Sequence, residues 1–272
     1  MLKLDAYTIA ALMIIGMNYY MLASGLWHAC MIFKRRTSVV FILVVSGLIS
    51  TIIEATASYI WLYMSLTEHQ QIVAGIITCI FWQLMLQIPC WLYVIRIKTL
   101  NCFNMSLVNY VNFCPYILFA AQIPSIITFM MAVFNNQVWG DFVISSAVTT
   151  VCASMIEIFL YCVLLFQIKF IFAHKRTLKK QMELELTASM LLLIVLDISL
   201  LVLKLGTVKI GPLVLPTSTV QLDNAIRPFS YLLRIKLIIQ FFDELLDNMD
   251  DKRTNTLSYY RWAPSSSADL QV

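Results

Sequence analysis

Three carboxylic acids stand inside otherwise apolar stretches of this 272-residue chain: Glu54, Glu157 and Asp197. A charged side chain at mid-bilayer costs at least about 2.5–3.5 kcal/mol, so acids in such positions face the interior of a helix bundle. Two interpretations follow. The acids are structural, protonated because desolvation disfavours a carboxylate and hydrogen-bonded across helices. Alternatively, they line a wet cavity that binds a cation, a proton or the amine of a ligand.

Further polar side chains are predicted to share that interior. Asp223 and Arg227 are four residues apart, so they can pair along one helix face, or Arg227 neutralises one of the three acids. Gln83 and Gln87 also lie four apart, where ordinary hydrogen bonding between helices is the alternative role. The predicted ligand or ion cavity contains Glu54, Gln83, Gln87, Glu157, Asp197, Asp223, Asn224 and Arg227.

The sequence gives little support for enzymatic chemistry. The histidines His28, His69 and His174 fall at the inner end of a predicted helix, in an outer loop and in an inner loop, so they cannot jointly hold a metal. No zinc-protease, nucleophile-elbow or phosphate-loop motif occurs. We therefore expect no catalytic residue, no metal and no cofactor. We also expect no nucleic acid partner, because the net charge of +4 comes from basic helix flanks that suit anionic lipid headgroups.

The elements that would position these residues are membrane-spanning helices. Apolar residues make up 60% of the chain and charged residues 12%, and a soluble domain of this composition would expose large apolar patches. Continuous apolar runs of about 20 residues predict helices rather than a β-barrel. The predicted spans cover residues 6–33, 39–66, 72–95, 107–134, 142–173, 186–205 and a weaker seventh within 213–242. The fold class is thus an all-α, seven-helix membrane bundle over residues 1–242, with a disordered cytoplasmic tail over 243–272.

The distribution of Lys and Arg predicts the orientation of the bundle. Basic residues follow the first, third and fifth spans, for example at 34–36, 96–98 and 175–180, whereas the loops at 67–71 and 135–141 contain none. By the positive-inside rule the N-terminus is outside and the C-terminus is cytoplasmic. The glycosylation sequon at Asn104 would then face the cytoplasm and remain unmodified. The expected location is a multi-pass position in a lipid bilayer, the plasma membrane rather than an internal one.

A weak internal repeat accompanies this topology. The segment 93–98, which ends the third span, is matched 138 residues later by 231–236, which ends the seventh. Spans one to three are then related to spans five to seven, with the fourth as a linker, in a parallel 3+1+3 arrangement. The alternative is convergence of unrelated helices on basic cytoplasmic ends.

The chain resembles the heptahelical G-protein-coupled receptors in its seven spans and its topology. Pro228 and Tyr231 look like the Pro-x-x-Tyr part of their seventh-helix motif, and Glu54 lies roughly where rhodopsin-like receptors keep a sodium-binding acid. Arg96 lies at the inner end of the third span but without the receptor Asp-Arg-Tyr pattern. The resemblance implies that Arg234 and Lys236 open a short amphipathic helix ending near residues 241–242. It also implies cytoplasmic coupling through Tyr93, Arg96, Lys98, Tyr231, Arg234 and Lys236.

Two functions are therefore expected. The first is a receptor-like protein that senses a small ligand within the bundle and signals to a cytoplasmic partner through its inner loops and tail. The second is a small-solute or proton/cation-coupled transporter, because a 3+1+3 arrangement also resembles sugar transporters of the SWEET type. A scaffold that binds cytoplasmic partners through the tail is a third alternative. The ligand itself is not identified by the sequence.

Overall fold

The described part of the chain is entirely helical. A computed structural model describes residues 6–33, 38–63, 67–100, 105–134, 139–171, 176–208 and 225–240. Within these ranges there are seven helices and no strand. They are α1 (Ala6–Ile32), α2 (Val39–Tyr63), α3 (Glu68–Leu100), α4 (Met105–Phe134), α5 (Trp139–Ile171), α6 (Arg176–Val208) and residues 225–240, here named the last helix. The prediction of an all-α protein is confirmed for these residues.

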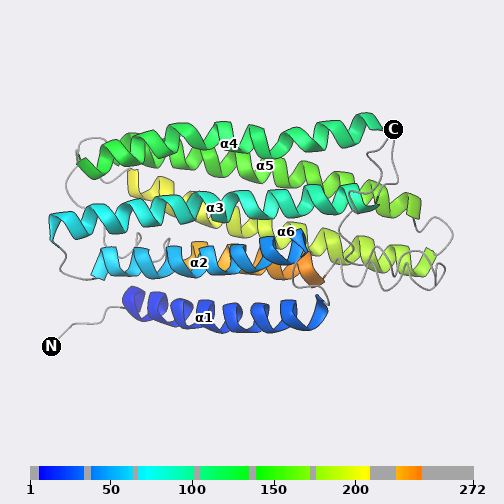
Figure 1. Cartoon of the computed structure of the whole chain (residues 1–272), viewed down its shortest axis with the longest axis horizontal. Helices are drawn as coiled ribbons and strands as arrows, with labels where there is room; N and C mark the ends of the chain where they lie inside the picture. The colour runs from blue at the N-terminus through cyan, green and yellow to red at the C-terminus, as the bar shows by residue number, and fades with distance from the viewer. Residues whose placement is uncertain are drawn as a thin grey trace, which may run out of the picture.

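The helices lie side by side along one long axis, and each runs opposite to the one before it (Figure 1). Consecutive helices from α1 to α6 pack against each other, and α3 also packs against α5. The middle helix of this arrangement is α3, which supplies much of the buried core, including Trp82, Met85, Leu92 and Tyr93. The last helix, drawn in orange, lies beside α2 and α6 and runs towards the end of the bundle where α1, α3 and α5 finish.

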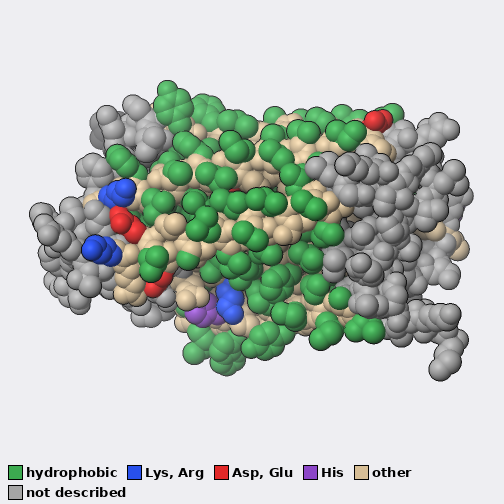
Figure 2. All heavy atoms as spheres, turned by 180° about the vertical axis from the view of Figure 1, so that it is seen from behind, with side chains coloured by type: hydrophobic (Ala, Val, Ile, Leu, Met, Phe, Trp, Pro, Cys, Tyr) green, Lys and Arg blue, Asp and Glu red, His purple; other side chains and the backbone are tan. Residues whose placement is uncertain are grey.

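Five of these helices are long and apolar enough to cross a membrane. The qualifying segments are Val39–Ile60, His69–Leu100, Asn109–Val133, Gly140–Lys169 and Lys180–Leu203. Large apolar side chains cover much of the described surface that is visible in Figure 2, and the few charged side chains seen there lie mostly in one half of the molecule. On α4, for example, Tyr116 is 62% exposed and Phe113 is 59% exposed. Such a surface fits lipid better than water, so the chain is a multi-pass membrane protein.

The helix boundaries differ from the predicted ones most clearly at the starts of α3 and α6. α3 begins at Glu68 instead of 72, because Thr67 precedes the helix and its backbone N–H donates to Gln70 Oε1 at 3.0 Å. α6 begins at Arg176 instead of 186, because Lys, Gln, Glu and Leu continue the helix beyond the apolar stretch. The seventh helix is described only from residue 225, and the predicted start at 213 lies outside the described residues.

A close approach of three helices occurs at Gly47 of α2. A β-carbon built there would lie 2.8 Å from Ile235 Cδ1 of the last helix and 2.9 Å from Ile88 Cγ2 of α3. Both distances are shorter than β-carbons tolerate, so only glycine fits without a shift of its neighbours. Gly16 of α1, by contrast, has no atom within 4 Å of the same position.

We therefore predict that Gly47→Ala lowers stability while Gly16→Ala does not. Overpacking costs about 1–3 kcal/mol, whereas alanine is a better helix former than glycine by about 1 kcal/mol at an open site. The measurement is the Tm of the purified protein in detergent, with the two alanine variants compared side by side. Equal Tm values for the two variants would contradict the close approach at Gly47.

Candidate functional site

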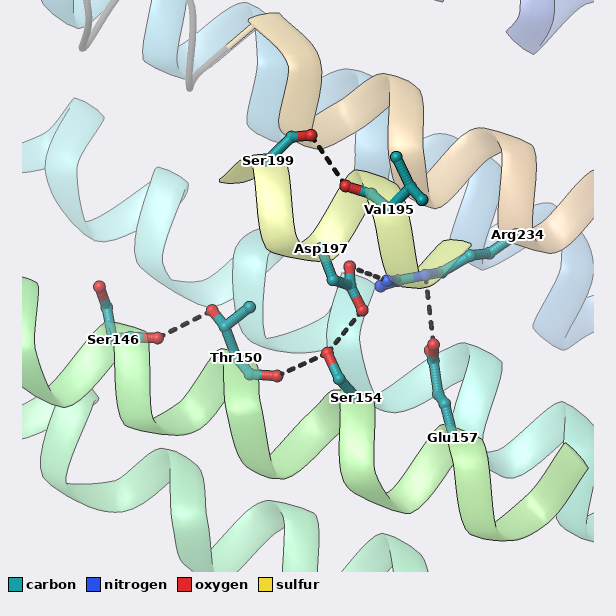
Figure 3. A network of polar contacts seen from close by, with 8 residues as sticks. All are labelled: Ser146, Thr150, Ser154, Glu157, Val195, Asp197, Ser199 and Arg234. Carbon is teal, nitrogen blue, oxygen red and sulfur yellow. Dashed lines mark hydrogen bonds and ion pairs between the residues drawn. The ribbon is translucent and has the colours of Figure 1, made fainter. Parts of the chain in front are cut away.

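A buried guanidinium joins the last helix to α5 and α6. The Arg234 side chain is 1% exposed and forms an ion pair with Asp197 of α6. Its Nε lies 3.3 Å from Glu157 Oε2 of α5. The Ser154 Oγ lies 2.5 Å from the second oxygen of Asp197, Oδ2. Figure 3 shows these side chains converging from three helices. We call Ser154, Glu157, Asp197 and Arg234 the inner charge cluster.

Aromatic side chains enclose the inner charge cluster. The Arg234 guanidinium lies 4.5 Å from the centre of the Tyr231 ring on its own helix, a cation–π contact. Tyr93 of α3 donates a 2.8 Å hydrogen bond to Tyr161 of α5, one helical turn beyond Glu157. All three tyrosines are buried. Because these buried rings surround the cluster, its charges are stabilised mainly by one another rather than by water.

A second ion pair lies nearer the start of the last helix. Arg227 Nη1 lies 3.6 Å from Glu54 Oε1 of α2, and the Glu54 side chain is completely buried. Ser58 donates to the same carboxylate oxygen at 3.2 Å, and the Trp82 ring of α3 lies 5.7 Å from the Arg227 guanidinium. This outer ion pair matches the alternative in which Arg227 neutralises one of the three acids. In the other alternative Arg227 pairs with Asp223. Both Asp223 and the neighbouring Asn224 lie outside the described residues.

The two arginines act from one face of one helix. Arg227 and Arg234 are seven residues apart, which is two helical turns or about 10 Å along the axis. Two contacts fix the same helix against α1: Asn18 Nδ2 donates to the Ala225 carbonyl at 3.1 Å, and Lys236 Nζ lies 3.4 Å from Ser24 Oγ. The last helix is therefore held by polar contacts to α1, α2, α5 and α6.

The inward orientation expected for the three acids is confirmed by their burial. Their exposed fractions are 0% for Glu54, 8% for Glu157 and 7% for Asp197. The structure does not bring all three together: Glu157 and Asp197 share Arg234, whereas Glu54 belongs to the outer ion pair. The predicted single cavity thus divides into two charge sites.

The glutamines take part in a different contact. Gln87 Nε2 lies 3.0 Å from Gln122 Oε1 of α4, and the Gln122 amide in turn donates to the Gln83 carbonyl at 3.5 Å. This pairing fits the alternative of hydrogen bonding between helices. The side-chain amide of Gln83 is buried with no hydrogen-bond partner among the described residues.

The residues predicted for cytoplasmic coupling occupy three different environments. The prediction that Arg234 opens a separate amphipathic helix is wrong. Arg234 lies inside a continuous helix over 225–240 and is buried there, because two buried acids are available to pair with its charge. Tyr93 and Tyr231 are buried beside it, and Arg96 is 6% exposed on α3. Lys98 is exposed, and Lys236 is half-buried against α1.

Sequence reasoning missed Ser154 and Tyr161, although a signal for Ser154 was present. Ser146, Thr150 and Ser154 recur every four residues on α5, and Glu157 follows three residues later, so all four share one face. Hydroxyls at helical spacing that lead to a buried acid predict a polar face within an apolar helix. Thr150 bonds back to the Ser146 carbonyl and Ser154 to the Thr150 carbonyl, at 2.8 and 3.0 Å (Figure 3).

A groove in the described surface contains none of the residues of the two charge sites. It is an apolar hollow between α2 and α3, lined by Ala57, Ile60, His69, Gln70, Val73, Ala74 and Ile77. None of the residues predicted to form the ligand or ion cavity lines it. Within the described residues there is also no group of three or more His, Cys, Asp or Glu side chains placed to hold a metal ion.

Comparisons with models of known protein families, with curated proteins and with solved structures found no match for this chain. The class defined by the fold and the site is therefore the general one: a multi-pass helical membrane protein with paired charges buried in its interior.

We predict that Arg234→Met strongly destabilises the protein, because it leaves two acids in the interior with no cation. Breaking a buried ion pair from one side costs about 3–5 kcal/mol. Lys236→Met on the same helix is the matched control and is expected to lower Tm much less, since Lys236 is half-buried and loses a 3.4 Å hydrogen bond to Ser24 rather than an ion pair with two buried acids. Adding Asp197→Asn and Glu157→Gln to Arg234→Met should restore much of the lost Tm. A triple variant no more stable than Arg234→Met would contradict the assigned pairing.

Proposed function

We propose that this chain is a receptor-like seven-helix membrane protein that senses a small ligand within the bundle and signals to a cytoplasmic partner. The observation that supports the proposal is the attachment of the last helix. Its two arginines pair with acids on α2, α5 and α6, and the helix leads into the predicted cytoplasmic tail. A ligand that competes for either pair changes how firmly this helix is held. The change is thereby passed to the cytoplasmic end of the bundle.

The orientation that this function requires places the N-terminus outside and the C-terminus in the cytoplasm, in the plasma membrane. Two observations support it. The helix ends that precede basic segments belong to α1, α3 and α5, and these ends lie together at one end of the bundle (Figure 1). The last helix runs towards the same end, so the tail that follows it would share the basic side.

We expect a C-terminal epitope tag to resist protease added to intact cells and to become cleavable after the cells are permeabilised. Asn104 should carry no glycan, because its sequon would face the cytoplasm. The control is a glycosylation sequon engineered at the N-terminus, which should be modified. Cleavage of the tag from outside, or a glycan on Asn104, would show that the orientation is reversed.

A transporter of 3+1+3 architecture is the second candidate, and one observation favours it. The hydroxyl row Ser146, Thr150 and Ser154 runs along α5 from the helix start towards the inner charge cluster. Buried acids in membrane spans mark proton and ion pathways, and a hydroxyl beside them can both donate and accept a hydrogen bond along such a pathway. The sequence repeat between 93–98 and 231–236 supports the same candidate.

Nucleotide exchange on trimeric G proteins distinguishes the two candidates. We predict that Arg227→Gln, which weakens the outer ion pair, raises the basal rate of nucleotide exchange. The rate at which at least one class of G protein binds a fluorescent GTP analogue should increase several-fold. The protein is reconstituted in lipid nanodiscs, and Asp141→Asn, which changes an exposed charged residue in the first turn of α5, serves as the control. Two results together would favour the transporter over the receptor. The first is that no class of G protein exchanges nucleotide faster than it does with empty nanodiscs. The second is that protons enter dye-loaded liposomes that contain the protein.

A further inference from the structure

The apolar groove between α2 and α3 lies at the boundary of two membrane spans. Ala57 and Ile60 lie in the last turn of the span Val39–Ile60, and His69 is the first residue of the span His69–Leu100. The groove is therefore at the end of the bundle where α2 finishes and α3 begins (Figure 1). Its volume is about 430 Å³, which falls within the range of about 300–1,000 Å³ for sites that bind small molecules.

The two ends of the groove differ in polarity. His69 and Gln70 lie in the first turn of α3 and are polar and exposed. Val73 and Ile77 lie one and two turns deeper in the same span and are apolar. Gln70 Oε1 accepts a 3.0 Å hydrogen bond from the Thr67 backbone N–H, so the amide offers a ligand the hydrogens of its Nε2. With the ring N–H of His69, the groove therefore presents hydrogen-bond donors at the membrane boundary, above hydrocarbon walls.

Hydrocarbon is the occupant that fits the deeper part of the groove. An apolar hollow does not hold water, because water needs polar partners, and an empty hollow would deprive its walls of dispersion contacts. Val73 is 55% exposed, so this wall faces outward from the bundle, where a membrane supplies acyl chains. A flexible acyl chain can follow an irregular groove between two helices.

The donors at the boundary select the headgroup. A phospholipid has ester carbonyl and phosphate oxygens next to its acyl chains, and these oxygens accept hydrogen bonds without donating. A sterol or a fatty alcohol has a single hydroxyl, which gives fewer acceptors for the two donors of His69 and Gln70. The arrangement of donors and hydrocarbon walls therefore matches a phospholipid better than either of these.

We propose that the groove binds one acyl chain of a membrane phospholipid, whose ester and phosphate oxygens accept hydrogen bonds from His69 and Gln70. The bound chain packs against Ala57, which follows Glu54 by one turn of α2. Ser58, the next residue, donates to Glu54 at 3.2 Å. The lipid thus supports the segment of α2 that holds the outer ion pair. This site goes beyond the proposed function and holds for a receptor or a transporter alike.

Photolabelling of the purified full chain in detergent tests the proposal without any mutation. The probe is phosphatidylcholine with a diazirine in one acyl chain, and the labelled residues are located by mass spectrometry of peptides. We expect the label to concentrate on residues 57–60 and 69–77. Excess unlabelled phosphatidylcholine should remove it, whereas a fatty alcohol of the same chain length should need a several-fold higher concentration to do so.

Variants then separate the chain site from the headgroup site. Ala57→Phe places a ring in the groove and should abolish the label, whereas Ala120→Phe, at an exposed alanine of α4, should keep it. His69→Leu should raise the phosphatidylcholine concentration needed for half-maximal labelling several-fold, and Gln71→Leu, an exposed neighbour outside the groove, should not.

The same variants allow a second measurement. Phosphatidylcholine should raise the Tm of the wild type and of Ala120→Phe, because a ligand that binds only the folded state stabilises it, and should leave the Tm of Ala57→Phe unchanged. Four results would overturn the proposal: label spread evenly over the exposed faces of α4 and α6, equal competition by the fatty alcohol, equal labelling of Ala57→Phe and Ala120→Phe, or a groove occupied by a cross-linked second copy of the chain instead of lipid.

Discussion

The pairing of Arg234 with two acids is the interaction on which the arrangement of the bundle depends. A guanidinium cannot be placed inside an apolar bundle without partners, and its partners here come from α5 and α6. Arg234 therefore fixes the last helix against the two helices that precede it in the chain. The outer ion pair adds α2 to the same attachment, and Asn18 and Ser24 add α1. A buried charge in a membrane protein therefore specifies neighbours more strictly than apolar contact does.

Packing around the charges follows from their position. The tyrosines of α3, α5 and the last helix surround Arg234, and they supply hydroxyls and ring faces where aliphatic side chains would leave a charge poorly solvated. The close approach at Gly47 brings α2 near Ile88 and Ile235, one residue after Arg234. Apolar packing and ion pairing thus act on the same part of the last helix.

The two charge sites differ in a way that bears on function. The outer ion pair joins the last helix to α2. The inner charge cluster joins the same helix to α5 and α6, because Arg234 contacts an acid on each of them. A ligand that displaces Arg234 would therefore act on three helices at once.

The sequence by itself determined the helical class, because continuous apolar runs of membrane length leave few alternatives, and five such helices are present in the described residues. It also determined that Glu54, Glu157 and Asp197 face inward, because lipid exposure of a carboxyl is too costly. It did not determine which partner each acid has. Sequence reasoning placed Arg234 at a cytoplasmic surface, since a basic residue near the end of a span usually lies there. Only the tertiary structure decided that Arg234 pairs with Asp197 and Glu157 while Arg227 pairs with Glu54. The reason is that helical spacing fixes which residues share a face, whereas the choice between neighbouring helices depends on how all of them pack together.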